Sequence, residues 1–113
     1  MHELTITQNM LDLVLKQAQE SGSKKVEKIN LVIGEMTGVV DRSMQFYFEL
    51  LSKDTPAQGA VLIFRMVPLQ AKCRDCGTSF DFNEGVGECP QCHLYNVEII
   101  SGNELFVESI EVE

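Results

Sequence analysis

Four cysteines stand in two Cys-x-x-Cys pairs, and twelve residues separate Cys76 from Cys89. Two residues between cysteines let a tight turn point both thiolates at one ion, and two such turns complete a tetrahedron around zinc, with zinc–sulfur distances of about 2.3 Å. Gly77 follows the first pair and supplies backbone freedom for such a turn. The spacing predicts a structural Zn²⁺ held by Cys73, Cys76, Cys89 and Cys92. Four thiolates leave no open coordination position, so we expect no catalysis there.

Other uses of these cysteines fit less well. A redox Cys-x-x-Cys usually stands alone at a helix N-terminus, and disulfides need an oxidising compartment that nothing in the sequence indicates. Residues 89–93 also match the attachment signature of c-type haem, but without an export signal we do not expect haem. His93 could replace a cysteine in the zinc shell, although an exposed imidazole beside Cys92 is the simpler interpretation.

A second candidate metal site is Met1-His2-Glu3 at the start of the chain. The Met1 amine, the His2 amide and the His2 imidazole can close two adjacent chelate rings, and three nitrogens in a plane favour nickel or copper. We expect Met1 to be retained, because methionine is removed poorly before a residue as bulky as His2. A histidine at position 2 is more often idle, so these residues alone leave metal binding open.

Composition excludes several functions. The chain has 113 residues and a formal net charge of −8, which opposes a nucleic-acid partner, since phosphate binding needs clustered Lys and Arg. No apolar stretch approaches the roughly 20 residues needed to cross a bilayer, so we expect no membrane partner and a cytoplasmic location. The sequence shows no Ser/His/Asp arrangement and no phosphate-binding glycine loop, which argues against an enzyme.

The remaining sequence must position these two sites. Helical spacing of apolar residues predicts helices over about 5–20 and from Asp41, a candidate N-cap, to about residue 54. Alternation or β-branched residues predict strands over 26–33, 60–69 and from Glu104 onward, and Pro68 suggests that the second strand lies at an edge. Phe80 and Phe82, between the cysteine pairs, indicate a short hairpin.

These elements predict an α+β fold, namely a small domain of two helices and a three-stranded sheet with an inserted zinc-ribbon-like module. The domain would comprise 1–70 together with 98–113, and the four-cysteine module 71–97. Residues 71–97 have few large aliphatic side chains, so we expect the module to depend on its metal.

Taken together, these features resemble the HypA/HybF family of hydrogenase nickel-incorporation proteins. The resemblance covers essentially the whole chain. It includes Met1-His2-Glu3-Leu4, Ile33-Gly34-Glu35, the paired cysteines with His93, and Gly102-Asn103-Glu104. A small departure is Thr5, where many relatives carry serine.

The resemblance implies a nickel metallochaperone rather than an enzyme. Ni(II) would be a labile cargo, held by Met1, His2 and a donor from Glu3, either amide or carboxylate. A GTPase partner would help to pass the ion to the [NiFe]-hydrogenase large-subunit precursor. Asp41 could approach the nickel, but a helix-capping role is favoured. The alternative is a zinc-ribbon interaction or regulatory module with no nickel role; a homodimer and a urease client both stay open.

Overall fold

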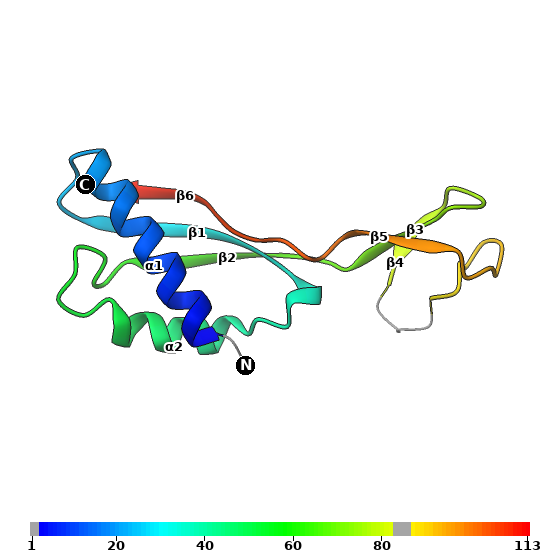
Figure 1. The fold of residues 1–113 in the computed structure, drawn as a ribbon, viewed down its shortest axis with the longest axis horizontal. Helices are drawn as coiled ribbons and strands as arrows, with labels where there is room; N and C mark the ends of the chain where they lie inside the picture. The colour runs from blue at the N-terminus through cyan, green and yellow to red at the C-terminus, as the bar shows by residue number, and fades with distance from the viewer. Residues whose placement is uncertain (1–2, 83–86) are drawn as a thin grey trace. The chain divides into compact units, whose positions relative to one another are not determined.

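The computed structural model describes residues 3–82 and 87–113. The chain divides into two compact units (Figure 1). The first contains the chain up to Val32, Val39–Arg65 and Leu105–Glu113, and the second contains Ile33–Gly38 and Met66–Glu104. The cysteine segment predicted at 71–97 falls within the second unit.

Two helices and a three-stranded sheet form the first part of the fold. Helix α1 spans Glu3–Glu20 and α2 spans Asp41–Leu51. The sheet has the order β2-β1-β6, with β1 at Val26–Gly34, β2 at Val61–Val67 and β6 at Leu105–Val112. These elements confirm the predicted α+β class, and β2 occupies an edge as Pro68 suggested.

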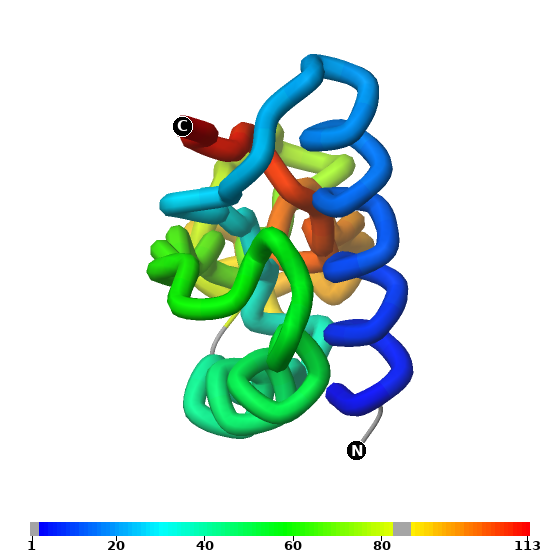
Figure 2. Tube along the Cα trace, turned by 90° about the vertical axis from the view of Figure 1, so that its left-hand side faces the viewer, coloured from blue at the N-terminus to red at the C-terminus, as the bar shows by residue number. Residues whose placement is uncertain are grey.

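The core of the first unit follows the apolar periodicity of the sequence. Helix α1 buries Met10, Leu11, Val14 and Ala18 on one face, and it packs against α2 (Figure 2). Helix α2 buries Met44 and Phe48, while β1 supplies further buried side chains, Val26, Ile29, Leu31 and Val32. None of the described helices is long and apolar enough to span a membrane.

Asp41 does not cap α2, contrary to the prediction. The cap residue is Val40, which has an extended backbone, and α2 already begins at Asp41. The Asp41 carboxylate instead accepts a hydrogen bond from the next amide, that of Arg42, at 2.7 Å. The Val40 amide donates to the Glu3 carboxylate at 3.3 Å, so a side chain from α1 serves the start of α2.

A second sheet, with the order β4-β3-β5, forms in the cysteine-bearing unit. Its strands are β3 (Gln70–Cys73), β4 (Ser79–Asp81) and β5 (Val97–Ser101), and β3 pairs antiparallel with both neighbours. The sequence pattern predicted a hairpin around Phe80 and Phe82, between the cysteine pairs, and its turn would fall in 83–86, outside the described residues. A described hairpin joins β3 to β4, with Cys73 at the end of β3 and Cys76 in the turn.

Two glycines allow a close approach of backbone segments in the second unit. A Cβ atom added to Gly34 would lie 2.1 Å from the backbone carbon and oxygen of Gly102, and one added to Gly102 would lie 2.7 Å from the Leu69 Cα. Three segments that are distant in sequence therefore pass in backbone contact. The short 3-10 helix η1 (Glu35–Thr37) follows this crossing, and the Glu35 carboxylate accepts the Leu69 amide at 2.7 Å.

Candidate metal centre

The first cysteine pair is shaped by the turn that follows β3. The Cys73 amide donates to the Thr78 carbonyl at 2.9 Å, and the Gly77 amide donates back to the Cys73 carbonyl at 2.9 Å. Gly77 has φ +79°, the left-handed region that glycine enters at little cost. These two bonds close a compact turn that contains Cys73 and Cys76.

The second pair repeats the same hydrogen bonds. The Cys89 amide donates to the Leu94 carbonyl at 2.9 Å, and the His93 amide donates to the Cys89 carbonyl at 2.8 Å. His93 stands where Gly77 stands in the first turn and takes a similar φ of +64°. The sequence signalled the left-handed position after Cys76 by its glycine, but gave no such signal after Cys92.

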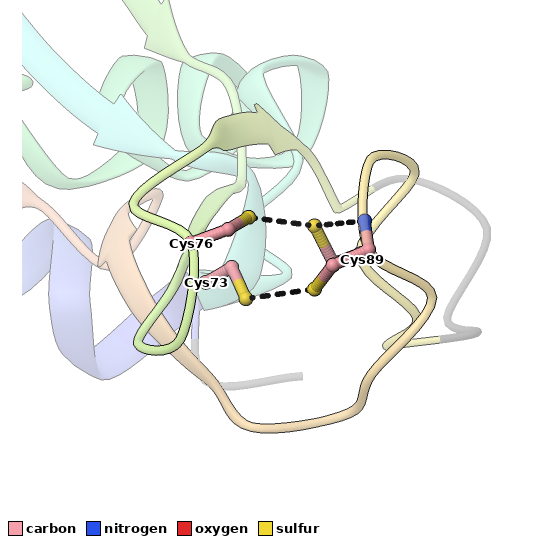
Figure 3. Close-up of side chains that lie close together, drawn as sticks. Cys73, Cys76 and Cys89 are labelled. Carbon is pink, nitrogen blue, oxygen red and sulfur yellow. Dashed lines mark hydrogen bonds between the residues drawn. The ribbon is translucent and has the colours of Figure 1, made fainter.

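The two turns bring all four sulfur atoms into one cluster. The Sγ atoms of Cys73 and Cys92 are 3.5 Å apart, as are those of Cys76 and Cys89, and all four lie within 4.8 Å of one another. Figure 3 shows the Cys76 and Cys89 thiols facing each other. A zinc ion at about 2.3 Å from each sulfur requires sulfur atoms about 3.8 Å apart, so the spacing fits a tetrahedral metal site.

Neighbouring donors and thiols set the acidity of this cluster. The amides of Gln91 and Cys92 point to the Cys89 sulfur at 3.4 and 3.5 Å. Hydrogen bonds from Thr78 lower the pKa of Cys76 to about 6. The Leu94 amide lowers the pKa of Cys92, but burial and the neighbouring thiols outweigh it and raise that pKa to about 12. A cation between the sulfurs would favour their thiolate forms.

His93 does not lie among the sulfur atoms. Its side chain is 70% exposed, and Nδ1 lies 2.6 Å from the Glu88 carboxylate. The Tyr95 hydroxyl donates to the other oxygen of Glu88 at 3.2 Å. Hydrogen bonds from His93 and then Tyr95 lower the pKa of Glu88. The exposed imidazole expected from the sequence thus has a carboxylate partner.

The amino-terminal candidate is only partly described. Met1 and His2 lie outside the described residues, so their predicted nickel-binding role stays a prediction. Glu3 is 7% exposed, and its carboxylate accepts the Val40 amide. Sequence reasoning missed this structural use of the carboxylate, because no local pattern links residue 3 to residue 40.

Comparison with known proteins gives whole-length matches. The family model described as hydrogenase/urease nickel incorporation, metallochaperone, HypA matches residues 1–112. A hydrogenase maturation factor HypA from Dehalococcoides mccartyi is 48% identical over 113 residues, covering 100% of this chain and 95% of that protein. One from Caldanaerobacter subterraneus is 43% identical, covering 100% of both chains.

Solved structures agree with these sequence matches. A solution structure titled HypA protein has a TM-score of 0.75 at 27% identity, covering 100% of this chain and 97% of that one. The solution structure of the Ni metallochaperone HypA from Helicobacter pylori has a TM-score of 0.66 at 26% identity, covering 99% of this chain and 97% of that one. The similarity therefore extends over both compact units.

Proposed function

Because the chain belongs to the HypA family of hydrogenase/urease nickel-incorporation metallochaperones, we propose that it binds Ni(II) at its N-terminus and delivers the ion to the [NiFe]-hydrogenase large-subunit precursor. A GTPase of the same maturation system acts with it. The family match over residues 1–112 carries this proposal. In this role the protein is a cytoplasmic carrier, and nickel is its cargo.

The nickel ligands in this proposal are the Met1 amine, the His2 amide and imidazole, and a donor from Glu3. The Glu3 carboxylate is buried and accepts a hydrogen bond from Val40. We therefore assign the remaining donor to the Glu3 amide nitrogen, which closes a further five-membered chelate ring with the His2 amide. Nitrogen donors suit Ni(II).

This ligand set also suggests how nickel is released. Amine, amide and imidazole nitrogens bind the metal only without their protons, so nickel affinity falls as pH falls. The ligands are consecutive groups at one end of the chain, so a partner can replace them one at a time. Glu3 keeps the first turn of α1 attached to the start of α2 during this exchange.

The four cysteines have a separate role in the proposal. They hold a structural Zn²⁺, which supplies a fixed cross-link between the two turns and no open position for chemistry. The sulfur spacing and the amide–sulfur contacts support this assignment. Thiolates are also soft ligands, unlike the nitrogens proposed for nickel, so each site suits its own metal.

Nickel titration of the untagged protein tests the proposal. We expect one tightly held zinc and one titratable nickel per chain, with nickel binding lost in His2→Ala or after acetylation of the terminal amine. His93→Ala is the matched control, because His93 is the only other histidine in the chain. Equal nickel affinity in His2→Ala and wild type would overturn the site, and a protein that binds zinc alone would favour an interaction or regulatory module.

Delivery needs a second measurement. Radioactive nickel loaded on the protein should move to the purified large-subunit precursor when the GTPase and GTP are present. His2→Ala should give no transfer at equal protein concentration. Transfer that proceeds equally well from free nickel alone would remove the need for a carrier.

A further inference from the structure

Helix α2 places two large apolar side chains in solvent. Phe46 is 57% exposed and Leu50 is 61% exposed, and their spacing of four residues puts them on one face of the helix. Met44 and Phe48 are each 1% exposed and occupy the opposite face. The Phe46 ring makes an edge contact with Tyr47, with ring centroids 5.5 Å apart. Core packing therefore does not account for Phe46 and Leu50.

Two cations bracket this apolar pair. Arg42 lies one turn before Phe46 on α2, and Lys53 lies in the turn that follows the helix, three residues after Leu50; we call these four residues the α2 stripe. Both cations are exposed, and neither forms a salt bridge with a described residue. Glu49 lies along the flank, and the exposed Asp41 and Asp54 are the sequence neighbours of the two cations. Two cations without a salt bridge to a described residue stand out in a chain with 17 acidic and 9 basic residues.

A second copy of the chain does not complement this stripe. If two α2 helices pair antiparallel with Phe46 against Leu50 of the other copy, Arg42 comes close to the other copy's Lys53. A parallel pairing brings Arg42 beside Arg42 of the other copy. Both arrangements place like charges together, which costs free energy at an interface. An anionic membrane would attract these cations but repel a chain of net charge −8.

A protein segment with apolar side chains between carboxylates fits better. Its apolar groups would cover Phe46 and Leu50, and its carboxylates would meet Arg42 and Lys53. A groove of about 450 Å³ is lined in part by Gln45, Glu49, Ser52 and Gln58. Because Glu49 also flanks the stripe, this groove offers a polar rim beside an apolar centre.

We propose that the α2 stripe is the docking surface for such an acidic, apolar segment, carried by the GTPase partner; naming the GTPase rests on the proposed function above. The stripe begins two residues after Val40, whose amide binds Glu3. A partner docked on α2 is therefore held next to the start of α1, where the nickel ligands are proposed to lie.

Calorimetric titration with the purified GTPase tests this surface. The double variant Phe46→Ser, Leu50→Ser should weaken binding at least tenfold. The variant Arg42→Glu, Lys53→Glu should also weaken it and reduce its salt dependence. The controls are Lys16→Glu, Lys24→Glu, which reverses two exposed cations elsewhere, and Leu13→Ser, which removes a 45% exposed leucine from α1. Both controls should bind as wild type does.

Nickel titration and zinc content should be unchanged in every variant, which separates docking from metal binding. Wild-type affinity in the two stripe variants, or an equal loss in Leu13→Ser, overturns the docking surface and leaves the nickel proposal intact. No binding by wild type overturns both the surface and the GTPase partnership. A dimer in light scattering that the stripe variants abolish, or stripe-dependent sedimentation with phosphatidylglycerol vesicles, assigns the stripe to another occupant and overturns the proposal.

Discussion

Glu3 has two groups that could bind nickel, its carboxylate and its backbone amide nitrogen. Its carboxylate accepts the Val40 amide, whereas the proposed nickel donor is its own amide nitrogen. Glu3→Gln keeps an oxygen that can accept the Val40 amide and keeps the backbone, so nickel affinity should stay within about threefold of wild type. Glu3→Ala removes the acceptor at the start of α2 and should cost about 1 kcal/mol of unfolding free energy.

Nickel titration and thermal unfolding of both variants check this assignment. The informative comparison is Glu3→Gln, because its fold should be close to that of the wild type. If this variant loses nickel while its melting temperature is unchanged, the carboxylate is a ligand and the amide assignment is wrong.

Gly77 and His93 occupy equivalent positions in the two cysteine turns. Gly77 has no side chain, whereas the His93 side chain contacts Glu88. Gly77 has φ +79°, and a Cβ there would meet nothing within 4 Å, so Gly77→Ala tests backbone strain alone. A non-glycine residue in this conformation costs about 1–2 kcal/mol, which predicts roughly tenfold weaker zinc binding. His93→Gly relieves similar strain at φ +64° but loses the Glu88 contact, so its zinc affinity should change less.

Competition with a chromophoric zinc chelator measures both affinities. The prediction requires wild type and His93→Gly to bind zinc with similar affinity, and Gly77→Ala to bind zinc more weakly. Equal affinity in Gly77→Ala and wild type would show that the first turn adopts another backbone conformation at no cost.

At the scale of elements, the crossing of Gly34 and Gly102 has little tolerance. A Cβ on Gly34 would lie 2.1 Å from backbone atoms of Gly102, so Gly34→Ala must displace backbone rather than a flexible side chain. We expect a loss of roughly 3 kcal/mol or more in unfolding free energy, of the size seen for severe overpacking. The Gly22→Ala control has open space and only its φ of +74° to oppose it, so it should lose about 1 kcal/mol.

Urea denaturation of the zinc-loaded variants measures this difference. Similar losses of unfolding free energy in the two variants would mean that the backbone segments at the crossing can move apart at little cost. The sequence alone could mark Gly34 and Gly102 as parts of the family motifs, but their mutual contact depends on tertiary structure.

Local patterns predicted the elements well where each has its own apolar face. Helical spacing in α1 and alternation in β1 indicate both the element and its buried side. The pattern failed at Asp41, because the start of α2 is served by Glu3 from another helix. It also missed β3 and β5, whose pairing depends on partners distant in sequence. The cysteine cluster was predictable because ligand spacing is itself a local constraint.

At the scale of the whole molecule, the two compact units differ in what holds them together. The first unit buries many aliphatic and aromatic side chains from both helices and from β1. Among the described residues of the second unit, the buried hydrophobic side chains are Ile33, Ala71, Cys73 and Cys89. Two of these four are cysteines of the four-sulfur cluster, so apolar burial supplies little of the stability of that unit.

Removal of the metal should therefore affect the two units unequally. With the metal withdrawn, the four thiols lose their cross-link, and the strands β3, β4 and β5 have too small a core to stay folded. Amide hydrogen exchange measured by mass spectrometry should show loss of protection across 70–101 after chelation. Protection of α1 and α2 should persist, because their buried contacts involve no metal ligand in the cysteine cluster.

Zinc that is added back should restore the lost protection, and Cys76→Ser should reproduce the chelated pattern without any chelator. Exchange that rises equally in both units would show that the metal stabilises the whole chain, and exchange that rises in neither would show that the second unit folds on apolar contacts alone.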